Sequence, residues 1–115
     1  MISMSRQRFA ALVDDALDEI PEEFASLLGN VIVQIEEEHP DEPETLGLYV
    51  GVALTERLSD YSFATPDTIT IYRRPILELC DTEEEVADEV VITVVHEVGH
   101  FFGIDDERLH ELGWA

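Results

Sequence analysis

The segment from Thr82 to Gly103 constrains the fold most, because it carries the signals of a long helix together with both of its ends. Thr82-Glu-Glu-Glu85 has the form of a capping box, in which the Thr82 hydroxyl accepts a backbone N–H and Glu85 reaches back. Gly103 stands where a left-handed residue would end the helix. Large apolar residues fill one broad arc between these ends: Val90, Val91, Val94, Val95, Val98, Phe101 and Phe102. We therefore expect a helix from Glu83 to about Phe102 that packs this arc on a core.

Two histidines lie on the other side of this helix. His96 and His100 are four residues apart, so their imidazoles project together from nearly the opposite side to the apolar arc, with Glu97 at the border. Two imidazoles about one turn apart can bind a single zinc ion at ~2.1 Å each. Glu97 then lies where it can accept a proton from a water on the metal instead of binding the metal. The pattern predicts a metal site rather than ordinary helix surface.

A catalytic zinc takes three protein ligands and keeps one position open. Gly103 lets the backbone swing back beneath the metal, and Asp106 then completes the pattern H-E-x-x-H-x-x-G-x-x-D as the third ligand. Asp105 competes for this role, because either aspartate can cap the short helix that we expect from 106 to 112. His110 lies on that helix and is interpreted as a surface residue; the alternatives are a surplus ligand or a hydrogen-bond partner of a metal ligand.

The rest of the chain predicts a single domain over residues 1–115 with helices and short strands, without an internal repeat or a linker. Apolar residues at helical spacing begin after Ser5 and continue to Ile20. The remaining elements are expected at a short helix from Pro21 to about Leu28, strands at 30–36, 46–52 and 68–72, and a turn of helix at 75–79. Loops are expected at 39–45 and between about Ala53 and Pro66, and the second is long enough to suggest a functional role.

Charge and composition exclude several classes of protein. The chain has 27 acidic residues against 6 basic ones, all arginine, for a net charge of −21, so it is not expected to bind nucleic acid. The single cysteine, Cys80, excludes an internal disulfide, and no apolar run approaches the ~18 residues of a membrane span. The first residues lack the apolar core of a signal peptide. We expect a cytoplasmic protein.

With this motif the chain resembles the zincin metallopeptidases, and among them the short bacterial minimal zincins. The stretches LGLYVGVALTER (46–57), ITIYRRP (69–75) and DDERL (105–109) are similar to that family as well, and the resemblance covers roughly residues 9 to 113. It implies an α/β (α+β) domain with helices packed on one side of a small mixed sheet. It also implies His96, His100 and Asp106 as zinc ligands and Glu97 as general base. The methionine-bearing turn of the longer metzincins has no counterpart among the nine residues after Asp106.

The sequence thus predicts a zinc-dependent hydrolase, most simply a peptidase that acts on basic or unfolded peptides. Tyr61, Tyr72 and Arg57 are candidates to stabilise the oxyanion of such a reaction, and the sequence does not choose among them. Two alternatives remain open at this stage. A noncatalytic interaction module with a structural or vestigial metal would fit the short chain and its acidic surface. A metal-dependent endoribonuclease uses three histidines at the same spacing, but Asp106 replaces the third histidine and the net charge opposes RNA.

Overall fold

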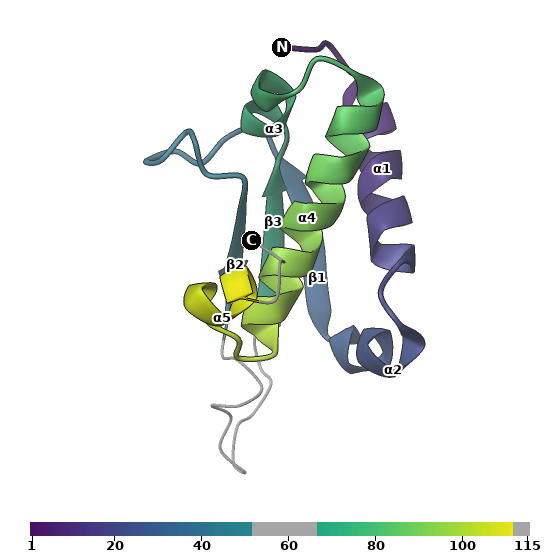
Figure 1. The fold of residues 1–115 in the computed structure, drawn as a ribbon, viewed down its shortest axis with the longest axis vertical. Coiled ribbons are helices and arrows are strands. Elements are labelled where there is room, and N and C mark those ends of the chain that lie inside the picture. The colour runs from purple at the N-terminus through teal and green to yellow at the C-terminus, as the bar shows by residue number, and fades with distance from the viewer. Residues whose placement is uncertain (52–66, 112–115) are drawn as a thin grey trace.

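The computed structural model describes residues 1–51 and 67–111, and Figure 1 shows their arrangement. Ser5 caps the first helix, α1 (Arg6–Asp18), by accepting the Arg8 backbone N–H at 3.1 Å. The next residues form one turn of helix, α2 (Glu22–Ala25), which continues as a 3₁₀ turn, η1 (Ser26–Leu28). Strands and the remaining helices follow in the order β1 (Val31–Glu36), β2 (Gly47–Val50), β3 (Asp67–Tyr72), α3 (Arg73–Leu79), α4 (Glu83–Phe101) and α5 (Asp106–Glu111).

The three strands form one mixed sheet in the order β1-β3-β2. β1 runs parallel to β3, and β2 pairs antiparallel to β3 on its other side with Gly47 opposite Ile71. The central strand β3 is buried along most of its length, as expected for a strand covered on both edges. Among the described strands, β1 and β2 therefore lie at the edges of the sheet, and the first residues of β2 approach α4 closely.

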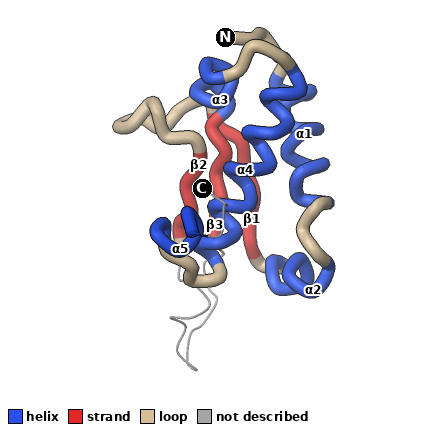
Figure 2. The backbone as a smooth tube through the Cα atoms, in the orientation of Figure 1, coloured by secondary structure: helices blue, strands red, loops and turns tan. Residues whose placement is uncertain are grey.

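The core lies between this sheet and the two long helices, which pack beside each other (Figure 2). It is built from the apolar stripe of α1, the inward residues of β3 and the valines of α4. Phe9, Ile71 and Val90 have no exposed surface at all. The predicted α+β fold, with helices packed on a small mixed sheet, is confirmed.

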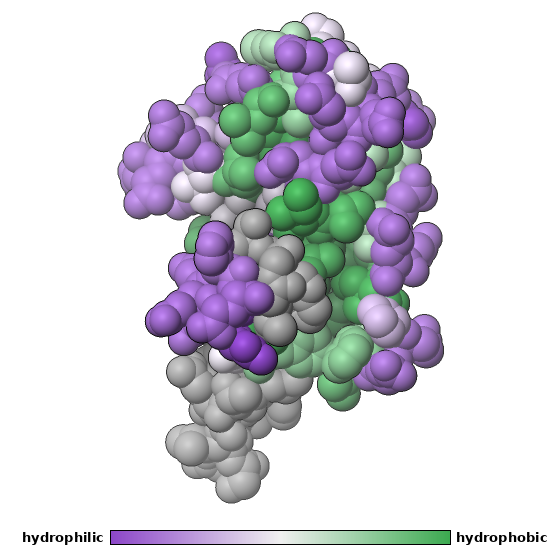
Figure 3. Space-filling model, in the orientation of Figure 1, coloured by the Kyte–Doolittle hydropathy of each residue, from purple (hydrophilic) through white to green (hydrophobic). Residues whose placement is uncertain are grey.

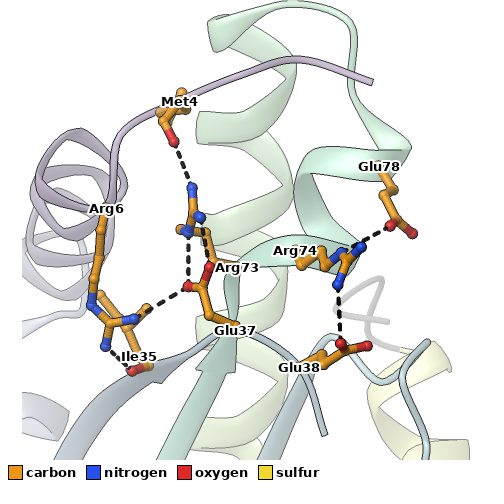
Figure 4. Close-up of polar contacts among 8 residues, drawn as sticks. All are labelled: Met4, Arg6, Ile35, Glu37, Glu38, Arg73, Arg74 and Glu78. Atoms are coloured by element: carbon orange, nitrogen blue, oxygen red, sulfur yellow. Dashed lines mark hydrogen bonds and ion pairs between the residues drawn. The ribbon is translucent and has the colours of Figure 1, made fainter.

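Arginine side chains tie the N-terminal segment to the ends of β1 and β3 (Figure 4). Arg73 makes a bidentate pair with Glu37, with Nε–Oε2 at 2.9 Å and Nη2–Oε1 at 2.6 Å, and also donates to the Met4 carbonyl. Arg6 donates to the same Glu37 carboxylate and to the Ile35 carbonyl. The hydrogen bond from Arg73, together with the nearby positive charges, lowers the pKa of Glu37 below its ordinary value. Arg6 and Arg73, two of the few basic residues of the chain, thus stabilise the fold.

Most predicted elements lie within a residue or two of their expected positions. The 46–52 strand is shorter than expected, at Gly47–Val50, and the helix expected at Pro75 begins two residues earlier at Arg73. Thr82 caps α4 as predicted, whereas Glu85 reaches back to the N–H of Asp81, at 2.9 Å. The loop expected between Ala53 and Pro66 falls outside the described residues. Among the helices that are described, none is long and apolar enough to cross a membrane.

Candidate metal centre

The end of α4 turns the chain back on itself. Gly103 has φ +84°, in the left-handed region where a Cβ is costly, and its N–H donates to the His100 carbonyl at 2.9 Å. The Ile104 N–H donates to the Gly99 carbonyl at 3.0 Å, which completes the C-terminal cap. A Cβ on Gly99 would lie 2.5 Å from Leu109 Cδ2, so only glycine lets α5 pack this closely against α4. The fully buried Leu109 therefore holds the start of α5 beside the two histidines.

Three side-chain atoms converge at this point. His96 Nε2 lies 3.1 Å from His100 Nε2, and Asp106 Oδ1 lies 3.1 Å from the first and 3.0 Å from the second. The histidine side chains are about a quarter exposed and the Asp106 side chain is 80% exposed, so the cluster opens to solvent on the α5 side. Within the described part of the chain, these residues form the one group of histidine, cysteine and carboxylate side chains with metal-binding geometry.

This donor set fits a zinc ion. Atoms about 3.1 Å apart in a near-equilateral triangle have a common point ~2.1 Å from all three, which is the length of a zinc–nitrogen or zinc–oxygen bond. His100 Nδ1 lies 3.0 Å from the Ile104 carbonyl, which accepts only from a protonated nitrogen. The Nε2 of a neutral His100 therefore presents a lone pair to the cluster. Two imidazole lone pairs and a carboxylate aimed at one point repel each other unless a cation or a shared proton lies between them.

Glu97 lies beside this cluster and is buried, with 6% of its surface exposed. Burial raises the pKa of its carboxyl above the ordinary value, and the positive charge available on His96 and His100 opposes this rise. The backbone of Tyr49 in β2 also hydrogen-bonds the carboxyl group and lowers the pKa. Gly47, two residues before Tyr49 in β2, lets the strand come close to this carboxylate, because a Cβ on Gly47 would lie only 3.3 Å from Glu97 Oε2. A carboxylate held in this way, next to a metal site, is suited to accept a proton.

The comparisons with known proteins agree with this geometry. The family model for zincin-like metallopeptidases matches residues 28–114. The chain belongs to this family. A metal ion, typically zinc, is therefore implied for this zincin domain, and the cluster of His96, His100 and Asp106 is where its described residues can hold one.

A solved structure shows the same zincin fold. It is that of a conserved hypothetical protein from Thermus thermophilus, which is 24% identical and superposes with a TM-score of 0.56 over 95% of this chain and 97% of that chain. No curated protein shows a significant match to the zincin domain.

The structure distinguishes between the candidate residues for which the sequence left more than one role open. Asp105 Oδ1 accepts the Arg108 N–H at 2.9 Å and so caps α5, which leaves Asp106 as the carboxylate in the cluster. His110 is exposed on α5 and is not among the converging atoms. His39 Nδ1 accepts the N–H groups of the loop residues that follow it, which is a structural role.

Candidates for stabilising an oxyanion are only partly described. Tyr72 is 4% exposed and its ring contacts His39, with centroids 5.8 Å apart. Because side chains alternate along a strand, it points to the opposite face of β3 from Ile71, which packs in the core beneath α4. Tyr72 is therefore not near the cluster. Arg57 and Tyr61, the other two candidates, lie outside the described residues.

Sequence reasoning missed the parts of the site that come from outside the motif. These are Gly47, the backbone of Tyr49 and the Ile104 carbonyl, which orients His100. A signal for the first was present, since a glycine inside a strand often marks the close approach of another element. The two backbone contacts depend on tertiary packing and leave no mark in the residue types.

Proposed function

We propose that this protein is a zinc-dependent peptidase in which His96, His100 and Asp106 hold the metal and Glu97 is the general base. The observation that carries the proposal is the convergence of the three donor atoms within 3.0–3.1 Å, beside a buried carboxylate that is not one of them. A purely structural zinc site is closed by four protein ligands and has no use for such a carboxylate. Membership of the zincin-like family supports the same conclusion.

A bound zinc ion supplies a Lewis acid, which acidifies water and polarises the scissile carbonyl. Glu97 accepts a proton from the attacking water at a carboxylate oxygen and later delivers it to the leaving amine. Its burial favours this exchange, because desolvation makes the carboxylate a stronger base than it would be in water. The backbone hydrogen bond from Tyr49 helps to hold the carboxylate in place.

The edge strand β2 suits an extended peptide. Among the described strands, β2 pairs only with β3, along one of its sides. The other side of such a strand can pair with an added chain, and there the Tyr49 backbone already hydrogen-bonds Glu97. A substrate chain laid along such an edge gains main-chain hydrogen bonds whatever its sequence. The contact of Gly47 with Glu97 brings this edge next to the base. The net charge of −21 attracts basic peptides and repels RNA.

The test combines metal content with cleavage. The parent protein, purified without chelator, should contain about one equivalent of zinc, and His96→Ala or Asp106→Ala should contain far less. The parent and Glu97→Gln are then compared on a broad peptide library and on structured RNA. We expect the parent to cleave peptides, and Glu97→Gln to keep its zinc but lose at least 100-fold in kcat/KM, since a positioned base contributes ~10²–10⁴-fold.

Other outcomes would replace the proposal. Zinc bound equally by parent and Glu97→Gln, without cleavage of any peptide, would indicate a noncatalytic interaction module. Cleavage of RNA by the parent would indicate a nuclease. No zinc uptake by the parent, or an uptake that His96→Ala leaves unchanged, would remove the metal site itself.

A further inference from the structure

A pocket of about 280 Å³ lies between α4 and the start of β2. One wall is a single stripe of α4 and the other is the backbone and side chain at the beginning of β2; together the lining residues are Glu89, Ile92, Thr93, His96, Glu97, Leu46 and Gly47. The stripe follows the spacing i, i+3, i+4, i+7, i+8, so the pocket runs along the helix axis. It begins at the proposed catalytic centre and ends at Glu89.

The middle of this pocket is apolar. The Thr93 hydroxyl donates to the Glu89 carbonyl at 2.8 Å, while its methyl group faces Gly47, where a Cβ would lie 2.8 Å away. Ile92 is 43% exposed and Leu46 is partly buried, so both present hydrocarbon to the pocket. Figure 3 shows apolar surface in the middle of the molecule, bordered by hydrophilic residues. Such a lining suits the methylene stem of a long side chain.

The far end of the pocket is acidic. Glu89 is partly buried, and no basic side chain in residues 1–51 and 67–111 pairs with its carboxylate. The five arginines of these ranges are committed to other glutamates: Arg6 and Arg73 to Glu37, Arg8 to Glu83, Arg74 to Glu38 and Glu78, and Arg108 to Glu111. Glu89 is therefore available to a cation that enters from outside.

The distances match a lysine or arginine side chain. Glu89 and His96 are seven residues apart on one helix, which is about 10 Å along its axis. An extended basic side chain plus one hydrogen bond spans about the same distance. A substrate residue held next to the zinc site thus places its stem against Ile92 and Thr93 and its charge at Glu89. An acidic side chain in this position would face both Glu89 and Glu97, which disfavours it.

We propose that this pocket is a substrate subsite that selects a lysine or arginine side chain, with Glu89 as the specificity-determining residue. The inference rests on the proposed peptidase function, since it places the selected residue next to the cleaved bond. It also gives the acidic character of the chain a local role, because the general field attracts basic peptides and Glu89 then fixes where one basic residue sits.

The experiment measures a ratio, which cancels differences in overall activity. Peptides carry lysine, norleucine or glutamate at each position flanking the cleaved bond; norleucine keeps the stem of lysine without its charge. We expect the parent to prefer lysine over norleucine at one position by roughly twofold to fivefold in kcat/KM, the range of an ion pair that stays partly exposed. Glu89→Gln should bring this ratio close to one, and Glu89→Lys should favour glutamate over lysine.

Asp88→Asn is the matched control, because it removes one negative charge from the adjacent, exposed position of the same helix. Its ratio should equal that of the parent. A ratio that Glu89→Gln leaves intact, or that Asp88→Asn lowers equally, would overturn the subsite while leaving the peptidase function in place.

A binding measurement separates the two proposals. Dissociation constants for the same labelled peptides are measured by fluorescence anisotropy with Glu97→Gln, alone and combined with Glu89→Gln. If the parent cleaves nothing but the lysine peptide binds more tightly in a Glu89-dependent manner, the peptidase function fails and the subsite stands. Equal binding of lysine and norleucine peptides without cleavage overturns both.

Discussion

Replacing Gly47 by alanine tests how closely the sheet and the base are coupled. The added Cβ would lie 2.8 Å from Thr93 Cγ2, 3.1 Å from Glu97 Cγ and 3.3 Å from Glu97 Oε2. The first distance is shorter than a carbon–carbon contact allows, so β2 or α4 must move. Thr93 cannot rotate freely, because its hydroxyl is bonded to the Glu89 carbonyl and its side chain is branched at Cβ. Relief of this contact therefore moves β2 away from Thr93, and the Glu97 carboxylate, which the Tyr49 backbone of β2 hydrogen-bonds, is displaced with the strand.

The expected magnitude follows from overpacking. Inserting one methyl group into a well-packed region costs typically 1–3 kcal/mol. For a domain of this size, one kcal/mol lowers the melting temperature by roughly 4 °C, so Gly47→Ala should melt about 4–12 °C below the parent. Movement of the Glu97 carboxylate by a few tenths of an ångström also misplaces the base. We therefore expect a fall of at least tenfold in kcat/KM, with zinc content unchanged, because the three atoms nearest to the added methyl group belong to Thr93 and Glu97 and not to the proposed zinc ligands.

Gly29→Ala is the matched control. Gly29 has φ −57°, a conformation open to alanine, and a Cβ there would meet only the Ser26 carbonyl oxygen, at 3.9 Å. This change should leave the melting temperature equal to or slightly above that of the parent. The measurements are thermal unfolding by circular dichroism, zinc content and peptide cleavage. If Gly47→Ala has the same melting temperature as Gly29→Ala and keeps full activity, the close approach of β2 to Glu97 does not position the proposed base.

Three further predictions concern the metal, the acid stability and the turn. The apolar core and the helix cap do not involve the proposed zinc ligands, so the chain should unfold cooperatively with chelator present. Cys80 is buried, which raises the pKa of its thiol, so it should react with a thiol reagent only on unfolding, with or without zinc. The pKa of Glu37 is lowered in the folded state, so its pair with Arg73 should stabilise the protein fully above the ordinary carboxyl pKa of 4.5 and lose this effect as the pH falls through the folded value. The free energies of unfolding in urea of the parent and Glu37→Gln should therefore differ near neutral pH and converge at acidic pH. Gly103→Ala should cost ~1–2 kcal/mol for the left-handed backbone and weaken zinc binding in a metal titration, since the turn places Asp106; a parent-like affinity would contradict this role.

Helical and strand periodicity predicted most of the fold, because those elements bury one face. The stripe that begins at Phe9 and the alternation of Val31, Val33 and Ile35 are both explained by a core on a single side. The arrangement of the strands was not predictable in the same way. β2 has only four residues, and their residue types do not indicate that they pair antiparallel with β3.

The histidine pair could be predicted because a helix fixes the relation between residues four apart. The burial of Glu97 was harder to predict from the sequence. The helix places it at the border of the apolar arc, and whether a border residue is buried depends on what packs there. Here β2 covers it, because Gly47 offers no side chain to keep the strand away. Burial of the Glu97 carboxylate thus depends on two segments that lie far apart in the sequence, and only the packed structure brings them together.

The choice between Asp105 and Asp106 shows how a local hydrogen bond decides which carboxylate joins the histidine cluster. Either aspartate was able to start α5 by its residue type. The Asp105 carboxylate accepts the Arg108 N–H, and its carbonyl accepts the Leu109 N–H, so helical backbone begins at the next residue. In this cap the Asp105 side chain is bonded to the backbone of Arg108 and is not part of the histidine cluster. Asp106 is the first residue of the helix, and its side chain points toward His96 and His100. For Asp105 to replace Asp106 in the cluster, α5 would have to give up its cap, which costs about 1 kcal/mol, and Leu109 would have to leave its contact with Gly99. The two adjacent carboxylates are therefore not interchangeable, although their side chains are identical.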